Sequence, residues 1–127
     1  MTIENIIDQD NKIILTLCSG VMVPEDFDIY VLRIWSDATY FEYNEIFDAT
    51  HANWDDFDFS HLLAVAKKAA MNGYLNPNSK LAWVISEGKQ KALTEFYTAA
   101  KLSLPVNSRE FKPFYNQADA MKWLLES

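Results

Sequence analysis

Residues 112–125, KPFYNQADAMKWLL, contain a short strand, a turn and an amphipathic helix. Asn116 stands where a helix N-cap is expected, and Asp119 follows three residues later. Apolar side chains then recur at helical spacing, at Ala120, Met121 and Leu124. Because Pro113 cannot donate a ladder hydrogen bond, the strand in residues 109–115 is predicted to lie at a sheet edge.

Three earlier segments repeat this order of strand and then helix. The predicted strands cover residues 12–18, 45–49 and 80–86, and the predicted helices cover residues 24–35, 60–71 and 90–102. A further strand, residues 3–7, forms an antiparallel hairpin with residues 12–18. Strands that alternate with helices imply right-handed crossovers onto a mainly parallel sheet. The sequence therefore predicts an α/β fold with a mixed, mostly parallel five-stranded sheet, an N-terminal hairpin and four helices.

The size and composition of the chain indicate one globular domain over residues 1–127. Half of the 127 residues are apolar and 14% are aromatic, which is enough for a sizeable core. No apolar run approaches the ~20 residues that span a bilayer, and the first residues lack the pattern of an export signal. We therefore expect a cytoplasmic protein. Cys18 lies in an apolar strand and is predicted to be a small core residue.

The net charge of −7 is unevenly distributed. Residues 25–58 hold ten acidic side chains against Arg33 alone, a local sum of −9. Nucleic-acid binding needs a basic face, so this balance weighs against it. An acidic block of this kind is either a docking surface for a basic partner or a solvated rim.

The polar and aromatic stretch 50–59 is the best candidate for a ligand site, because open α/β sheets usually bind ligands at the carboxyl ends of their strands. The candidate ligand-binding residues are Asp48, Thr50, His51, Trp54 and Phe57, together with Trp35 on the first helix. The alternative is that these rings pack over the core. Ser60 is a candidate helix cap, and the alternative is that it accepts a phosphate.

No motif for catalysis, cofactor binding or metal binding is present. The chain has no glycine-rich phosphate loop, no Gly-x-Ser-x-Gly elbow and no Cys-x-x-Cys. His51 and His61 are ten residues apart, which matches no metal-ligand spacing. We therefore expect no catalytic residues, no cofactor and no metal site. A small enzyme that uses His51 and Asp48 remains the alternative.

The first helix carries apolar side chains outside its core stripe. Ile29, Tyr30 and Leu32, with Trp35, predict either a homodimer contact or the wall of a site for an apolar ligand.

Three stretches resemble the SpoIIAA-like (STAS/SEC14-type) family of small bacterial proteins. They are GVMVPEDF at residues 20–27, FDA at residues 47–49, and FYNQADAMKWL at residues 114–124. The resemblance implies a four-turn β/α superhelix. Its best understood relatives are anti-anti-sigma switch proteins with a phosphorylated serine in an Asp-Ser-Ser-Gly motif, where this chain has Asp48-Ala49-Thr50-His51. SEC14-type relatives bind lipids.

These observations predict an uncharacterised cytoplasmic, non-enzymatic binding or regulatory module. Its partner would be an apolar small molecule, a lipid or another protein. The alternative is a phosphorylation-linked partner switch, similar to an anti-sigma-factor antagonist, with Ser60 or Thr50 as the acceptor.

Overall fold

The computed structural model describes residues 2–55, 57, 59–86, 88–102 and 109–126. It contains one sheet in the order β1-β2-β3-β4-β5, in which β1 is antiparallel to β2 and the other pairs are parallel. The strands are β1 (Thr2–Asp8), β2 (Ile13–Val21), β3 (Asn44–Asn53), β4 (Lys80–Val84) and β5 (Glu110–Phe114). The predicted hairpin, parallel sheet and edge strand with Pro113 are confirmed.

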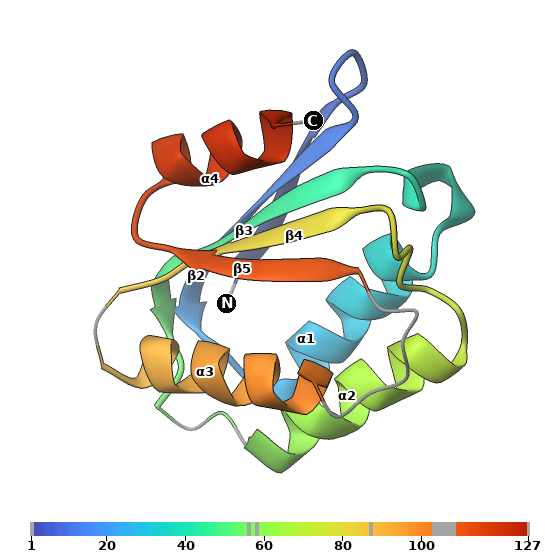
Figure 1. Cartoon of the computed structure of the whole chain (residues 1–127). Coiled ribbons are helices and arrows are strands. Elements are labelled where there is room, and N and C mark those ends of the chain that lie inside the picture. The colour runs from blue at the N-terminus through green and yellow to red at the C-terminus, as the bar shows by residue number, and fades with distance from the viewer. Residues whose placement is uncertain (1, 56, 58, 87, 103–108, 127) are drawn as a thin grey trace.

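Four main helices connect and cover the strands. They are α1 (Pro24–Tyr30), α2 (Phe59–Met71), α3 (Lys89–Leu102) and α4 (Gln117–Leu125), and a 3-10 turn (Ala38–Tyr40) precedes β3. Helices α1, α2 and α3 lie on one face of the sheet, and α4 lies on the other (Figure 1). Because residues alternate along a strand, each central strand supplies side chains to both layers.

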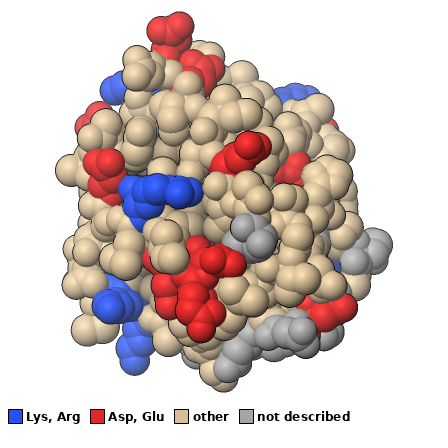
Figure 2. All heavy atoms as spheres, turned by 180° about the vertical axis from the view of Figure 1, so that it is seen from behind, with Lys and Arg blue, Asp and Glu red and all other residues tan. Residues whose placement is uncertain are grey.

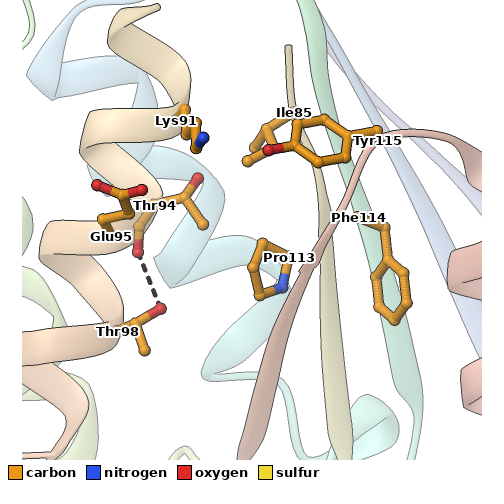
Figure 3. A pocket seen from close by; sticks show the side chains of 8 residues that line it. All are labelled: Ile85, Lys91, Thr94, Glu95, Thr98, Pro113, Phe114 and Tyr115. Atoms are coloured by element: carbon orange, nitrogen blue, oxygen red, sulfur yellow. Dashed lines mark hydrogen bonds between the residues drawn. The ribbon is translucent and has the colours of Figure 1, made fainter. Parts of the chain in front are cut away.

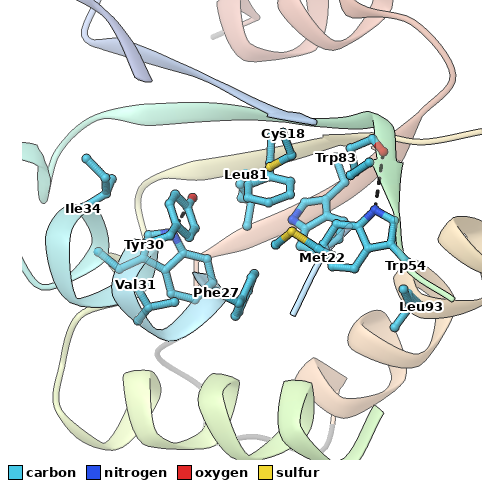
Figure 4. Close-up of a cluster of buried hydrophobic side chains, with 14 of the residues drawn as sticks. Cys18, Met22, Phe27, Tyr30, Val31, Ile34, Trp54, Leu81, Trp83 and Leu93 are labelled. Carbon is cyan, nitrogen blue, oxygen red and sulfur yellow. Dashed lines mark hydrogen bonds between the residues drawn. The ribbon is translucent and has the colours of Figure 1, made fainter. Parts of the chain in front are cut away.

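The larger core lies between the sheet and helices α1 to α3, and it is rich in aromatic rings (Figure 4). Phe47 of β3 and Trp83 of β4 stack with their ring centroids 4.7 Å apart. Phe27 of α1 packs edge-on against Phe47 at 6.3 Å. Aromatic pairs in these offset and edge geometries stabilise a core beyond the area that they bury.

The smaller core lies under α4. Trp123 and Leu124 pack with Ile46 and Val84, which point to the opposite face from Phe47 and Trp83. The side chain of Asn116 accepts a hydrogen bond from the backbone N–H of Asp119 at 2.8 Å, so the predicted N-cap is confirmed.

The first helix changes its winding halfway. Residues 24–35 are helical, as predicted. They form an α-helix only as far as Tyr30, and Val31–Trp35 continue as a π-helical turn. Ile29 and Leu32 are 57% and 65% exposed, whereas Tyr30 is fully buried. The assignment of Tyr30 to the outer surface is therefore wrong. Its hydroxyl is buried because it has a polar partner inside the core, described below.

The second parallel strand is longer than the sequence indicates. β3 continues to Asn53, so residues 50–53 of the predicted loop belong to the sheet. Residues 51–53 pair with Ser19–Val21 of β2, beyond a shift in register between Leu17 and Ser19. Helix α2 begins at Phe59, which places Ser60 within its first turn instead of at the cap. These differences arise because strand pairing is decided by the neighbouring strand and not by local sequence.

Candidate ligand site

The aromatic candidates from the predicted loop belong to the core. Trp54 is 2% exposed, and Phe57 is also buried. The Trp54 ring lies 5.0 Å from Phe57 and 5.9 Å from Trp83, measured between centroids, and its N–H donates to the carbonyl of Ala49 (Figure 4). Trp54 belongs to the same buried cluster as Phe47, Phe57 and Trp83. Trp54 and Phe57 therefore pack in the core, which was the alternative to a role in ligand binding.

Trp35, the candidate from the first helix, is buried near the opposite end of β3. Its indole N–H lies 2.9 Å from the hydroxyl of Tyr30 and 3.2 Å from a carboxylate oxygen of Glu45. Glu45 is at the amino end of β3, whereas Trp54 follows its carboxyl end. The structure therefore does not bring Trp35 and Trp54 into one site.

The polar candidates form a separate cluster beside α4. Asp48 accepts hydrogen bonds from the backbone N–H and the hydroxyl of Thr50, at 3.0 and 2.6 Å, and from the amide of Gln117 at 2.6 Å. Burial acts to raise the pKa of Asp48, but these hydrogen bonds and the nearby His51 outweigh it and lower the pKa. His51 itself is exposed. The cluster joins β3 to the start of α4.

A pocket of about 270 Å³ lies between α3 and the edge strand β5 (Figure 3). Its apolar side is formed by Ile85, Pro113 and Tyr115, at the carboxyl ends of β4 and β5. The backbone N–H of Ile85 donates to the carbonyl of Phe114 at 2.9 Å, which fixes these two strand ends together. The ring of Phe114 points away from the pocket and packs on Trp123, with centroids 5.6 Å apart.

The opposite side of this pocket is polar. Lys91, Thr94, Glu95 and Thr98 of α3 line this side (Figure 3). The Thr98 hydroxyl donates to the carbonyl of Thr94 at 2.9 Å. Sequence reasoning missed this site. The spacing of these four residues does place them on one helical face, but nothing local shows that this polar face meets an apolar strand.

A second groove, of about 320 Å³, lies between α2 and the segment formed by α1 and the π-helical turn. Val31 and Leu32 line one side, and Val65 and Ala69 of α2 line the other. At one end, Nε2 of His61 lies 2.8 Å from a carboxylate oxygen of Asp28, which links the two helices.

A buried polar network centred on Glu45 lies at the amino end of the sheet. The Glu45 carboxylate accepts hydrogen bonds from the hydroxyls of Thr16 and Tyr30, and it pairs with Arg109 at 3.5 Å. Burial, and then the charge of Glu45, raise the pKa of Tyr30 well above its ordinary value. Arg109 also donates to the carbonyls of Tyr43 and Lys80. The sequence signal that could have indicated this network is Glu45, an acidic residue next to the apolar strand residues Ile46 and Phe47.

Cys18 is buried in the larger core, as predicted. Burial raises the pKa of its thiol, and the charges of Glu45 and Asp48 add to this effect. A thiol in this environment stays protonated at neutral pH and is a poor nucleophile.

The described residues were also compared with the requirements of a metal site and of a membrane-spanning helix. Among those residues no group of three or more His, Cys, Asp and Glu side chains has the geometry of a metal site. Their helices are also too short or too polar to cross a membrane. On the face opposite to that of Figure 1, basic and acidic side chains lie in separate small patches, and the largest cluster is acidic (Figure 2).

Comparison with known proteins identifies the architecture. No family model matches the chain, and no curated protein matches its sequence. The chain is similar to the crystal structure of an uncharacterised protein of the DUF3478 family, with a SpoIIAA-like fold, from Shewanella loihica PV-4. The match has a TM-score of 0.61 and 20% sequence identity, and it covers 97% of this chain and 92% of the other. The predicted architecture is therefore confirmed, and the protein has a SpoIIAA-like fold.

Proposed function

We propose that this protein is a non-enzymatic binding module that holds a small, largely apolar molecule between α3 and β5. The observation that carries the proposal is the pocket of about 270 Å³, with an apolar side at the carboxyl ends of β4 and β5. Ligands of open α/β sheets bind at such strand ends. The volume lies just below the usual range for small-molecule sites, which favours a ligand with a short apolar body.

The polar side of the pocket supports an orienting role. Lys91 carries a cation and Glu95 a carboxylate, and the hydroxyl-bearing Thr94 and Thr98 lie on the same helical face. A few polar groups at the rim of an apolar pocket usually fix the orientation of a ligand. A molecule with an apolar chain and one anionic end would place that end at Lys91, away from the Glu95 carboxylate.

The composition of the pocket lining supports a binding role over a catalytic one. Neither histidine lines the pocket, and Cys18 is buried elsewhere. His61 of α2 contacts Asp28, and His51 is exposed near the carboxyl end of β3, outside the pocket lining. Among the described residues of the lining there is no histidine or cysteine, the side chains that most often serve as general base and as thiolate nucleophile.

Titration with decanoate, an alkyl chain with one carboxylate, tests the proposal. In ¹H–¹⁵N NMR spectra we expect the largest shift changes at Lys91, Thr98 and Tyr115. Thr98→Phe fills the pocket and should weaken binding by about tenfold or more. The hydroxyl of Thr98 donates to the Thr94 carbonyl in the preceding helical turn, a local bond whose loss should leave the fold intact.

The matched control is Ala92→Phe on the same helix. Ala92 is exposed and does not line the pocket, so this variant should bind decanoate like the unaltered protein. Equal affinity of the two variants, or shift changes confined to another surface, would show that the pocket is not the binding site.

A phosphorylation-linked partner switch is the second candidate. The observation that favours it is the exposed Ser60 in the first turn of α2, where a phosphate interacts favourably with the helix dipole. Thr50 is less suited, since its hydroxyl donates to Asp48, which would repel a phosphate. Phosphopeptide mass spectrometry of protein isolated from its host tests this candidate, and consistently unmodified Ser60 would count against it.

A further inference from the structure

We propose that a small cavity at the amino ends of β3, β4 and β5 is a binding site for one buried water molecule, which Arg109, Glu45 and Ser79 hold. The cavity has a volume of about 10 Å³, and all three residues line it. Among the described residues, its lining shares no member with the pocket between α3 and β5. The proposal therefore stands or fails independently of the proposed ligand.

Three strands meet at this cavity. Glu45 lies near the start of β3, Ser79 immediately precedes β4, and Arg109 immediately precedes β5. The backbone N–H of Glu110 donates to the carbonyl of Ser79 at 3.0 Å, which joins the last two of these strand ends. The side chains of Glu45, Ser79 and Arg109 are all buried, so the site lies inside the molecule.

Arg109 brings a buried donor to the site that has no partner among the described residues. Its Nη2 donates to the carbonyls of Tyr43 and Lys80 at 3.1 and 3.2 Å, and its Nη1 lies 3.5 Å from Oε1 of Glu45. The Nε–H, in contrast, has no hydrogen-bond partner in the described part of the chain. Arg109 is 7% exposed, and a buried N–H without an acceptor is costly. This donor therefore favours an acceptor in the cavity.

Glu45 and Ser79 bring acceptors to the same cavity. Oε1 of Glu45 faces the indole N–H of Trp35 at 3.2 Å and Nη1 of Arg109 at 3.5 Å, both at or beyond the long end of the usual range of about 2.7–3.2 Å. This oxygen can therefore accept a further hydrogen bond. The Ser79 hydroxyl donates to the carbonyl of Asn76 at 2.8 Å, and its oxygen is still able to accept.

The size and the chemistry of the site select water as the ligand. A volume of about 10 Å³ is close to that of one water-sized sphere. The ligand has to accept from Arg109 and donate to Glu45. A chloride ion cannot donate and an ammonium ion cannot accept, whereas water does both. With Nε of Arg109, Oε1 of Glu45 and Oγ of Ser79, water has three partners, which is the usual number for a buried water molecule.

A crystal structure of the full chain, at a resolution that shows ordered water, tests the proposal. We expect one water molecule within about 3.2 Å of Nε of Arg109 and of an oxygen of Glu45 or Ser79. A protein group in this position, or no density there, would overturn the proposal.

Nuclear magnetic resonance tests the same site in solution. In a ¹⁵N-resolved rotating-frame Overhauser spectrum, the Nε–H of Arg109 should show a cross-peak to water. The indole N–H of Trp54 is the internal reference, because Trp54 is buried, donates to the carbonyl of Ala49 and does not line the cavity. Since a hydroxyl could relay magnetisation from water, the proposal requires both the density and the cross-peak. An absent cross-peak at Arg109, or an equal one at Trp54, would contradict it.

A double variant tests the dependence on the charged pair. Glu45→Gln with Arg109→Met removes the Nε–H, and we expect the water density to be lost. The matched control is Arg33→Met, because Arg33 is exposed, donates to Asn5 and does not line the cavity. The control should keep the water. The same water in the folded double variant would show that Arg109 does not hold it, and the measurements on the unaltered chain decide the question if the double variant does not fold.

Discussion

At the scale of single residues, Glu45 is the most consequential polar side chain of the core. It is 1% exposed, and its carboxylate is surrounded by Thr16, Tyr30, Trp35 and Arg109. Removing one partner of a buried ion pair leaves the other charge without compensation, which is costly. We therefore expect Glu45→Gln to lower the free energy of unfolding by about 3 kcal/mol, measured by urea denaturation.

The double variant Glu45→Gln, Arg109→Met is the control for this prediction. It removes both charges, so its loss of stability should be smaller than the sum of the two single losses. Strict additivity of the two substitutions would show that Glu45 and Arg109 do not interact.

Asp48 provides a prediction for pH dependence. Its pKa is lowered from the ordinary value of 3.8, so folding favours its charged form. The resulting stability is fully present above that value and is lost as the pH falls through the lower pKa of the folded state. Asp48→Asn should therefore destabilise the protein near neutral pH, and its difference from the unaltered protein should shrink below about pH 4.

Urea denaturation at several pH values measures this difference. The control is Asp10→Asn in the exposed turn of the hairpin, which should change stability little at any pH. A difference between Asp48→Asn and the unaltered protein that stays constant down to about pH 2 would contradict the assignment.

At the scale of elements, α4 depends on its cap. The Asn116 side chain accepts a hydrogen bond from the Asp119 N–H at 2.8 Å, and the helix covers one face of the sheet through Trp123. Asn116→Ala should lower the free energy of unfolding by about 1 kcal/mol. Asn116→Gly should cost less, since glycine is tolerated at this position. Equal stability of the alanine variant and the unaltered protein in urea would contradict this role.

The elements also show where sequence reasoning reaches its limit. The capped helix α4 and the edge strand with Pro113 were predictable, because a cap and a missing N–H are local properties. The extension of β3 to Asn53 was not, because residues 51–53 are held by pairing with β2. The π-helical turn at Val31–Trp35, whose last residue donates its indole N–H to Glu45, has no sequence signature either.

At the scale of the whole molecule, one sheet separates two cores. The larger core contains Trp35, Trp54 and Trp83, and the smaller one contains Trp123. Because β3 and β4 supply side chains to both, neither core can be lost without disturbing the other. We therefore expect a single cooperative unfolding transition, as predicted for one domain.

Urea denaturation followed by two probes tests this cooperativity. Tryptophan fluorescence reports both cores, and far-ultraviolet circular dichroism reports all helices. The two curves should coincide with one midpoint. Repeating the fluorescence measurement with Trp123→Phe removes the signal of the smaller core, and a shift of the remaining curve away from the dichroism curve would show that the two cores unfold separately.

The sequence by itself determined the order of strands and helices, the hairpin, the edge strand and the capped terminal helix. These depend on periodicity, capping and proline chemistry, which act over a few neighbouring residues. Only the tertiary structure decided that Trp54 and Phe57 fill the core, that Glu45 meets Arg109, and that α3 and β5 enclose a pocket. The reason is physical: these contacts join residues far apart in the chain, and burial and pairing exist only once the strands and helices have packed.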